Sequence, residues 1–185
     1  NGYKMVNPGV FKDYNIDVNK IIEGHSKAMQ NRENFAMPLG EDKYILQTGT
    51  QFYGITKCFT NPGSYYNYVV VDQNNNYAGY INIVRNNADN KNAEIEIGIS
   101  PSIQRKGLGT EVINRFYSEL FSIGYASVTS AIFSFNIPSL KLHEKVSSLN
   151  GIRIESYYIN GKLWNINYYT KVNDKIGELK YVRHK

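Results

Sequence analysis

Residues 97–110 read IGISPSIQRKGLGT and join a strand pattern to a helix pattern through a short basic turn with two glycines. The residues before the turn, 94–99, alternate charged and apolar side chains, as a half-buried strand does. The residues after it, 109–123, carry apolar side chains at a helical period. The start of a helix offers unpaired backbone N–H groups and the positive end of the helix dipole. The turn is therefore a candidate anion site.

Glycines before a helix also occur in turns that bind nothing, so a purely structural turn is the alternative interpretation. The segment is not a P-loop, because the Gly-Lys-Ser/Thr end of that motif is absent. It is also not a GxGxxG dinucleotide fingerprint, and no acidic residue follows at the end of a next parallel strand.

The flanking segments predict a mixed α/β sheet. The order along the chain is strand, strand, strand, helix, strand, helix, strand, strand, with polar residues 85–92 as a loop. Asn160-Gly161 is a strong hairpin turn between the last two strands. Besides the strand and helix above, one further helix is expected at residues 138–146. The other expected strands are residues 65–71, 77–84, 126–135, 152–158 and 163–171.

The first sixty residues carry weaker patterns. Residues 17–30 have apolar side chains on one helix face, with Asn15 or Asp17 as the candidate cap. A second helical stretch is expected at about 41–59, although two glycines within it disfavour a helix.

Composition narrows the class of protein. The chain has 185 residues, a net charge of +5 and one cysteine, Cys58, so an intramolecular disulfide and a multi-cysteine zinc site are excluded. The three histidines lack metal-ligand spacing, and no metal is expected. No apolar run approaches the ~20 residues of a membrane span, so we expect a cytoplasmic protein without a membrane partner. Because the basic residues are scattered, nucleic acid is an unfavoured partner.

Two motifs resemble one family. QRKGLG at residues 104–109 resembles the pyrophosphate loop of the GNAT (GCN5-related N-acetyltransferase) superfamily, written (Gln/Arg)-x-x-Gly-x-(Gly/Ala). NIPSLKLHEK at residues 136–145 is similar to that family's Asn-x-x-(Ala/Ser)-x-x-(Leu/Phe)-Tyr-Glu-Lys segment. The resemblance covers residues 65–171 and is strongest to the branch of ribosomal-protein N-terminal and spermidine acetyltransferases. It implies a mostly antiparallel sheet flanked by helices, with a splayed central strand pair.

The resemblance also implies a binding site for acetyl-CoA as cosubstrate. Backbone N–H groups of the loop would hold the pyrophosphate, and the end of the preceding strand would pair with the pantetheine arm like an added strand. Asn136 matches the family asparagine that contacts this arm, and it could equally cap the following helix. The expected cosubstrate-binding residues are Ile97, Gly98, Ile99, Gln104, Arg105, Lys106, Gly107, Leu108, Gly109, Thr110, Asn136 and Ser139.

Three residues are candidates for catalysis. His143 stands where the family usually has a tyrosine that protonates the departing thiolate, and imidazole can also donate a proton. The alternative is that His143 is a packed helix residue. Tyr168 or Tyr169 could then be the proton donor in its place. Glu94 and Glu96 lie two apart on one strand and so face the same side. Either carboxylate could accept the proton of an attacking amine or bind a cationic amine, and the alternative is that both point to solvent.

The resemblance implies an N-acetyltransferase that moves an acetyl group directly to a primary amine in a ternary complex. The acceptor is a small amine or polyamine, or a protein N-terminus or lysine. The alternative is a CoA-binding regulatory or interaction module with impaired catalysis, suggested by histidine in place of tyrosine. We expect a single domain over 1–185, with a variable helical region at 1–60, an acyl-CoA-binding core at 65–171 and a basic tail at 172–185. Residues 177–182 (GELKYV) could pair across a homodimer.

Overall fold

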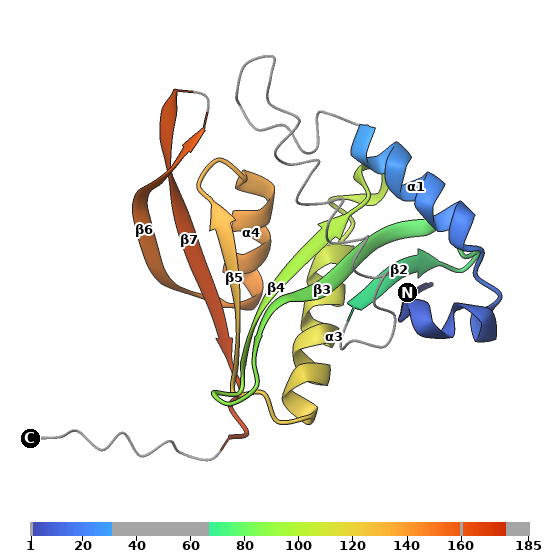
Figure 1. Ribbon diagram of the computed structural model, residues 1–185, viewed down its shortest axis with the longest axis horizontal. Helices are drawn as coiled ribbons and strands as arrows, with labels where there is room; N and C mark the ends of the chain where they lie inside the picture. The colour runs from blue at the N-terminus through green and yellow to red at the C-terminus, as the bar shows by residue number, and fades with distance from the viewer. Residues whose placement is uncertain (1, 31–66, 160, 177–185) are drawn as a thin grey trace, which may run out of the picture.

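The computed structural model describes residues 2–30, 67–159 and 161–176, which form a seven-stranded sheet with helices on both faces (Figure 1). The strand order is β1-β2-β3-β4-β5-β7-β6. All neighbours are antiparallel except β4 and β5, which are parallel. This confirms the predicted mixed, mostly antiparallel α/β sheet. The strands are β1 (Tyr3–Val6), β2 (Asn67–Asp72), β3 (Tyr77–Asn87), β4 (Asn92–Ile99), β5 (Ser127–Phe133), β6 (Ser148–Ile159) and β7 (Lys162–Val172).

The helices divide between the two faces of the sheet. On one face, α1 packs with η1 against β2, and the buried cluster there consists of Val6, Phe11, Ile16, Ile21, Val69 and Val71. On the other face, α3 and α4 pack against the sheet and against each other. The helical segments are η1 (Pro8–Tyr14), α1 (Val18–Gln30), η3 (Pro101–Ile103), α3 (Leu108–Ser122) and α4 (Ile137–Val146).

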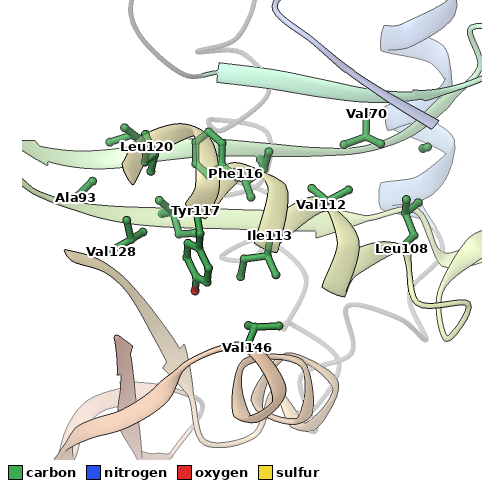
Figure 2. Packing of buried hydrophobic residues seen from close by; sticks show 14 residues of the cluster. Val70, Ala93, Leu108, Val112, Ile113, Phe116, Tyr117, Leu120, Val128 and Val146 are labelled. Carbon is green, nitrogen blue, oxygen red and sulfur yellow. The ribbon is translucent and has the colours of Figure 1, made fainter. Parts of the chain in front are cut away.

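Helix α3 is the centre of the larger core (Figure 2). Val112, Ile113, Phe116 and Leu120 are at most 3% exposed, and their spacing places them on one side of the helix. Each such burial contributes roughly 1.5–3 kcal/mol relative to exposure. Val146 of α4 lies beside Ile113 in the same cluster. The N-terminus of α3 is therefore fixed relative to both β4 and α4.

Most of the predicted elements are present with shifted ends. Polar residues 85–92 were expected to form a loop, yet Arg85–Asn87 continue β3 and pair with residues 92–94 of β4. A bulge between Ile83 and Arg85 accompanies this extension, which the apolar pattern could not indicate. The sequence patterns also missed β1 and η1. The expected helix at 41–59 and the dimer strand at 177–182 lie outside the described residues.

Strands β4 and β5 separate soon after they meet. Their pairing is limited to Asn92↔Ser127, Ala93↔Val128 and Glu94↔Thr129. Beyond these pairs β4 continues to Ile99, while β5 continues to Phe133 beside β7. Figure 1 shows the two strands diverging toward the end at which α3 begins. The predicted splayed strand pair is thus present.

Candidate functional site: the gap between β4 and β5

The turn before α3 exposes backbone rather than side chains. Gly107, the N-cap residue, has φ 84°, a left-handed conformation that favours glycine, and no side chain caps the helix. A Cβ at Gly107 would have no heavy atom within 4 Å. Arg105 and Lys106 are exposed, whereas Leu108 is anchored in the core. The start of α3, without a side-chain cap, therefore lies next to two exposed cationic side chains, an arrangement that suits a pyrophosphate.

The end of β4 presents backbone groups to the gap. The Ser100 N–H donates to the Ala78 carbonyl at 2.8 Å, so the polar groups of Ser100 face β3. By the alternation of an extended strand, those of Ile97 and Ile99 face the opposite side, where β5 has moved away. There the Gln104 side-chain amide donates to the Ile99 carbonyl at 2.9 Å. Gln104 thus ties the turn to the strand, while Ile97 lies beyond the last residue pair between β4 and β5.

The two sequence motifs meet in space. A Cβ at Gly109 would lie 3.3 Å from Cδ2 of Leu142 on α4, a tighter approach than most side chains allow. The motif glycine therefore lets α3 and α4 pack closely. Thr110 follows in the first turn of α3 and is partly exposed.

Asn136 caps α4. Its Oδ1 accepts a hydrogen bond from the Ser139 backbone N–H at 3.3 Å, and Asn136 is the N-cap residue of the helix. This confirms the capping interpretation of the sequence. The contact of Asn136 and Ser139 with a pantetheine arm stays a prediction.

His143 is buried in α4. Its side chain is 1% exposed, and its Nδ1 lies 2.8 Å from the Ser139 carbonyl oxygen. Because a carbonyl only accepts, Nδ1 carries the proton and the buried Nε2 is left without a hydrogen-bond partner. Burial lowers the pKa of His143, and the hydrogen bond to Ser139 only partly opposes this. The imidazole is thus a neutral group at neutral pH.

Tyr169 of β7 lies next to this histidine. Their ring centroids are 6.0 Å apart, and the Tyr169 hydroxyl is 3.4 Å from Glu144 Oε1. Burial and the nearby Glu144 carboxylate raise the pKa of Tyr169. The phenol therefore stays protonated and available as a hydrogen-bond donor.

Glu94 and Glu96 project from β4 on the face that α1 covers, but their surroundings differ. Glu94 lies 3.5 Å from a guanidinium nitrogen of Arg85, whose side chain is 82% exposed. Glu96 accepts a hydrogen bond from the Tyr80 hydroxyl at 2.6 Å. Glu94 therefore belongs to a surface ion pair, whereas Glu96 belongs to the packed face of the sheet.

The candidate base and the candidate acid lie on opposite faces. Glu96 is on the side of α1, and His143 is on the side of α3 and α4. Sequence reasoning did not identify Tyr80 as the neighbour of Glu96, or Arg85 as the neighbour of Glu94, because such contacts depend on strand register. Register places Tyr80 opposite Gly98 and Arg85 opposite Glu94.

Two negative findings apply to the described ranges 2–30, 67–159 and 161–176. They contain no cluster of three or more His, Cys, Asp or Glu that could hold a metal ion. None of their helices has the length and apolar character needed to cross a membrane.

The geometry agrees with what the chain resembles. A curated relative, "Putative phosphinothricin acetyltransferase YwnH" of Bacillus subtilis (strain 168), is 36% identical over 81 residues, which cover 42% of this chain and 50% of the relative. This chain thus matches half the length of that protein. A spermidine N-acetyltransferase from Vibrio cholerae, solved with CoA and spermine, has a TM-score of 0.67 at 18% identity, covering 94% of this chain and 97% of its own.

A ribosomal L7/L12 alpha-N-protein acetyltransferase, RimL, has a similar fold, with a TM-score of 0.65 at 14% identity over 92% of this chain and 90% of its own. At these identities the two structures support the fold alone. The family model described as "Acetyltransferase (GNAT) family" matches residues 28–147, more than half of the chain. This protein belongs to the GNAT acetyltransferase family.

Proposed function

We propose that this protein transfers an acetyl group from acetyl-CoA to a primary amine, in one step within a ternary complex. The observation that carries the proposal is the separation of β4 and β5 directly beside the uncapped N-terminus of α3. The proposal takes residues 1–185 as one domain, with 65–171 as its acyl-CoA-binding core. Family membership and the CoA-bound spermidine acetyltransferase of similar fold support it.

In this proposal the backbone binds the cosubstrate. Amides of residues 104–110 hold the pyrophosphate, and the outward groups of Ile97 and Ile99 on β4 pair with the pantetheine arm. Gln104 would have to release the Ile99 carbonyl before that group could pair. Asn136 and Ser139 at the start of α4 lie along the same route. The thioester then enters the gap between the two strands.

Side chains carry the proton transfers. An amine must be neutral to attack a thioester, and Glu96 takes its proton on the face of α1. Glu94 attracts cationic acceptors toward the same face, and its ion pair with Arg85 weakens this attraction. His143, on the opposite face, is the proposed proton source for the departing thiolate, which it could serve only in its minor protonated form, and the protonated Tyr169 beside it is the substitute.

The acceptor is proposed to be a small amine or polyamine, or a protein N-terminus or lysine. The relatives named above are linked to three different amines: phosphinothricin, spermidine and the N-terminus of a ribosomal protein. A thiol-release assay with spermidine, phosphinothricin and a protein N-terminal peptide as separate acceptors would identify the class. We expect one of these to be acetylated at least ~10-fold faster than the others.

A specific observation favours a second candidate, a CoA-binding module without catalysis. His143 replaces the usual tyrosine, is buried, and directs its only proton to a backbone carbonyl. Calorimetric titration with acetyl-CoA, with ATP as the control ligand, distinguishes the candidates when combined with the thiol-release assay. Binding with turnover supports the enzyme, and binding without turnover of any amine supports the module. Absence of CoA-selective binding would contradict both.

A further inference from the structure

Tyr80 of β3 crosses over β4 instead of standing upright on its own strand. Its register partner is Gly98, and a Cβ at Gly98 would lie 2.4 Å from Cε1 and 2.9 Å from Cζ of the Tyr80 ring. Any larger residue at this position would displace the ring. Gly98 therefore serves a second purpose besides its place in the cosubstrate strand: it leaves room for an aromatic ring to lie across the strand.

The crossing brings the Tyr80 hydroxyl to Glu96, two residues before Gly98 on the same face of β4. The hydroxyl donates to Glu96 Oε1 at 2.6 Å, a short bond of the kind that phenols and hydroxyls make to carboxylates. Tyr80 itself is 2% exposed. Glu96 is partly exposed, so the bond joins a buried phenol to a carboxylate at the edge of the solvent and limits the orientations of that carboxylate.

The other side of the ring is also held in place. His25 of α1 lies edge-on to Tyr80, with ring centroids 6.1 Å apart and an interplanar angle of 73°. His25 in turn hydrogen-bonds through Nδ1 to the Tyr77 hydroxyl at 3.0 Å. Tyr80 is thus confined between helix α1 and strand β4, and its hydroxyl has little freedom to leave Glu96.

We infer that Tyr80 is the positioning residue for Glu96, the carboxylate that accepts the proton of the attacking amine. This inference rests on the proposed function. The phenol O–H donates a hydrogen bond to Oε1, which restricts the rotation of the carboxylate about its side chain and stabilises its charged form. A base held in one orientation is already placed when the amine arrives, so less of the binding energy is lost in ordering it.

The test is Tyr80→Phe in the full-length protein, which removes one oxygen and keeps the ring between Gly98 and His25. We expect kcat to fall about 10-fold, with the KM for acetyl-CoA unchanged. The acidic limb of the pH–rate profile should move to higher pH, because the carboxylate loses a hydrogen bond to its charged form. A role in packing alone would move neither this limb nor kcat at unchanged stability.

The matched control is Tyr68→Phe. The Tyr68 hydroxyl also donates to a carboxylate, that of Glu119 on α3, but on the opposite face of the sheet. This variant loses the same kind of bond away from the site and should keep the wild-type kcat and pH profile. Thermal unfolding and acetyl-CoA titration of both variants establish that they are folded and loaded.

A double-mutant cycle with Glu96→Gln isolates the link between the two residues. If Tyr80 acts through Glu96, adding Tyr80→Phe to Glu96→Gln changes kcat by less than about 2-fold. Additive losses, or a Tyr80→Phe variant with the wild-type rate and acidic limb, would overturn the inference while amine acetylation stood. A folded wild-type protein that acetylates no amine overturns the proposed function and this inference together.

Discussion

The proposed cosubstrate loop and the proposed acceptor face of β4 differ in the groups they would use: the loop uses its backbone, and the face uses side chains. In the proposed function, residues 104–110 bind the cosubstrate through backbone amides, and no side chain caps α3 at Gly107. The proposed acceptor face around Glu96 depends instead on side chains that reach across strands, as Tyr80 does. The first kind of site depends on local sequence, and the second depends on register. Mutations should therefore separate them cleanly.

The largest effect is expected at the loop. Gly107→Glu should weaken acetyl-CoA binding by about 100-fold or more, because a carboxylate at the start of α3 repels the pyrophosphate. Calorimetric titration measures this loss. Gly124→Glu is the matched control, since Gly124 lies beyond the C-terminal end of α3, also has a positive φ (101°), and also has open space around its Cβ position. Equal losses in both variants would contradict the loop assignment.

The acceptor face should respond in turnover rather than in cosubstrate binding. Glu96→Gln is expected to lower kcat/KM for the amine about 100-fold with acetyl-CoA affinity unchanged, because it removes the proposed base. Glu94→Gln, on the same face two residues away, should change it by about 3-fold or less, since an ion pair whose Arg85 side chain is 82% exposed contributes little. Steady-state thiol release gives both values. The reverse order would exchange the roles of the two carboxylates.

His143 should have a smaller effect than Glu96. We expect His143→Phe to lower kcat about 10-fold, because burial lowers the pKa of this imidazole and leaves few molecules protonated at neutral pH. Single-turnover measurements of the acetyl-transfer step would detect the change. A wild-type rate in a folded His143→Phe variant would show that the proton comes from elsewhere, and Tyr169→Phe would then be the next variant.

Acid should destabilise the face under α1. Burial lowers the pKa of His25 to about 4. As pH falls from about 6.5 toward 4, His25 is therefore protonated in the unfolded chain but not in the folded protein, and the free energy of unfolding decreases. His25 alone should remove roughly 3 kcal/mol of unfolding free energy over this range. The lowered pKa of His143 acts in the same direction. Urea denaturation at pH 7 and pH 4.5 measures the loss, and His25→Gln should flatten it.

The fold was largely predictable because its helices and strands carry their own periodicity. Residues 109–123 and 138–146 match α3 and α4 within about two residues at each end. Strand β1 was missed because four residues, YKMV, carry no pattern of their own and are strand only through pairing with β2. The extension of β3 through Arg85–Asn87 was missed for a similar reason, since its polar residues pair with β4.

The site was predictable only where it is local. The loop before α3 and the cap at Asn136 are both set by residues adjacent in the chain. The structure shows the cap, and the binding role of the loop stays a prediction. The contacts of Glu96 and Glu94 do not, because they depend on which residues of β3 lie opposite β4. The glycine at position 98 was visible within a strand pattern, but without the strand register the sequence could not connect it to Tyr80.

The brief parallel contact between β4 and β5 has a consequence for stability. Three residue pairs join these strands, whereas seven join β5 to β7, so the described sheet has its shortest strand pairing along its middle. A cosubstrate arm bonded to the outward side of β4 would add hydrogen bonds where the strands have separated. Binding of the cosubstrate to the folded protein would then raise the free energy of unfolding of the sheet. The Ile97 backbone amide would record the loading as slowed hydrogen exchange, so the protein would be most rigid when charged with its acetyl donor.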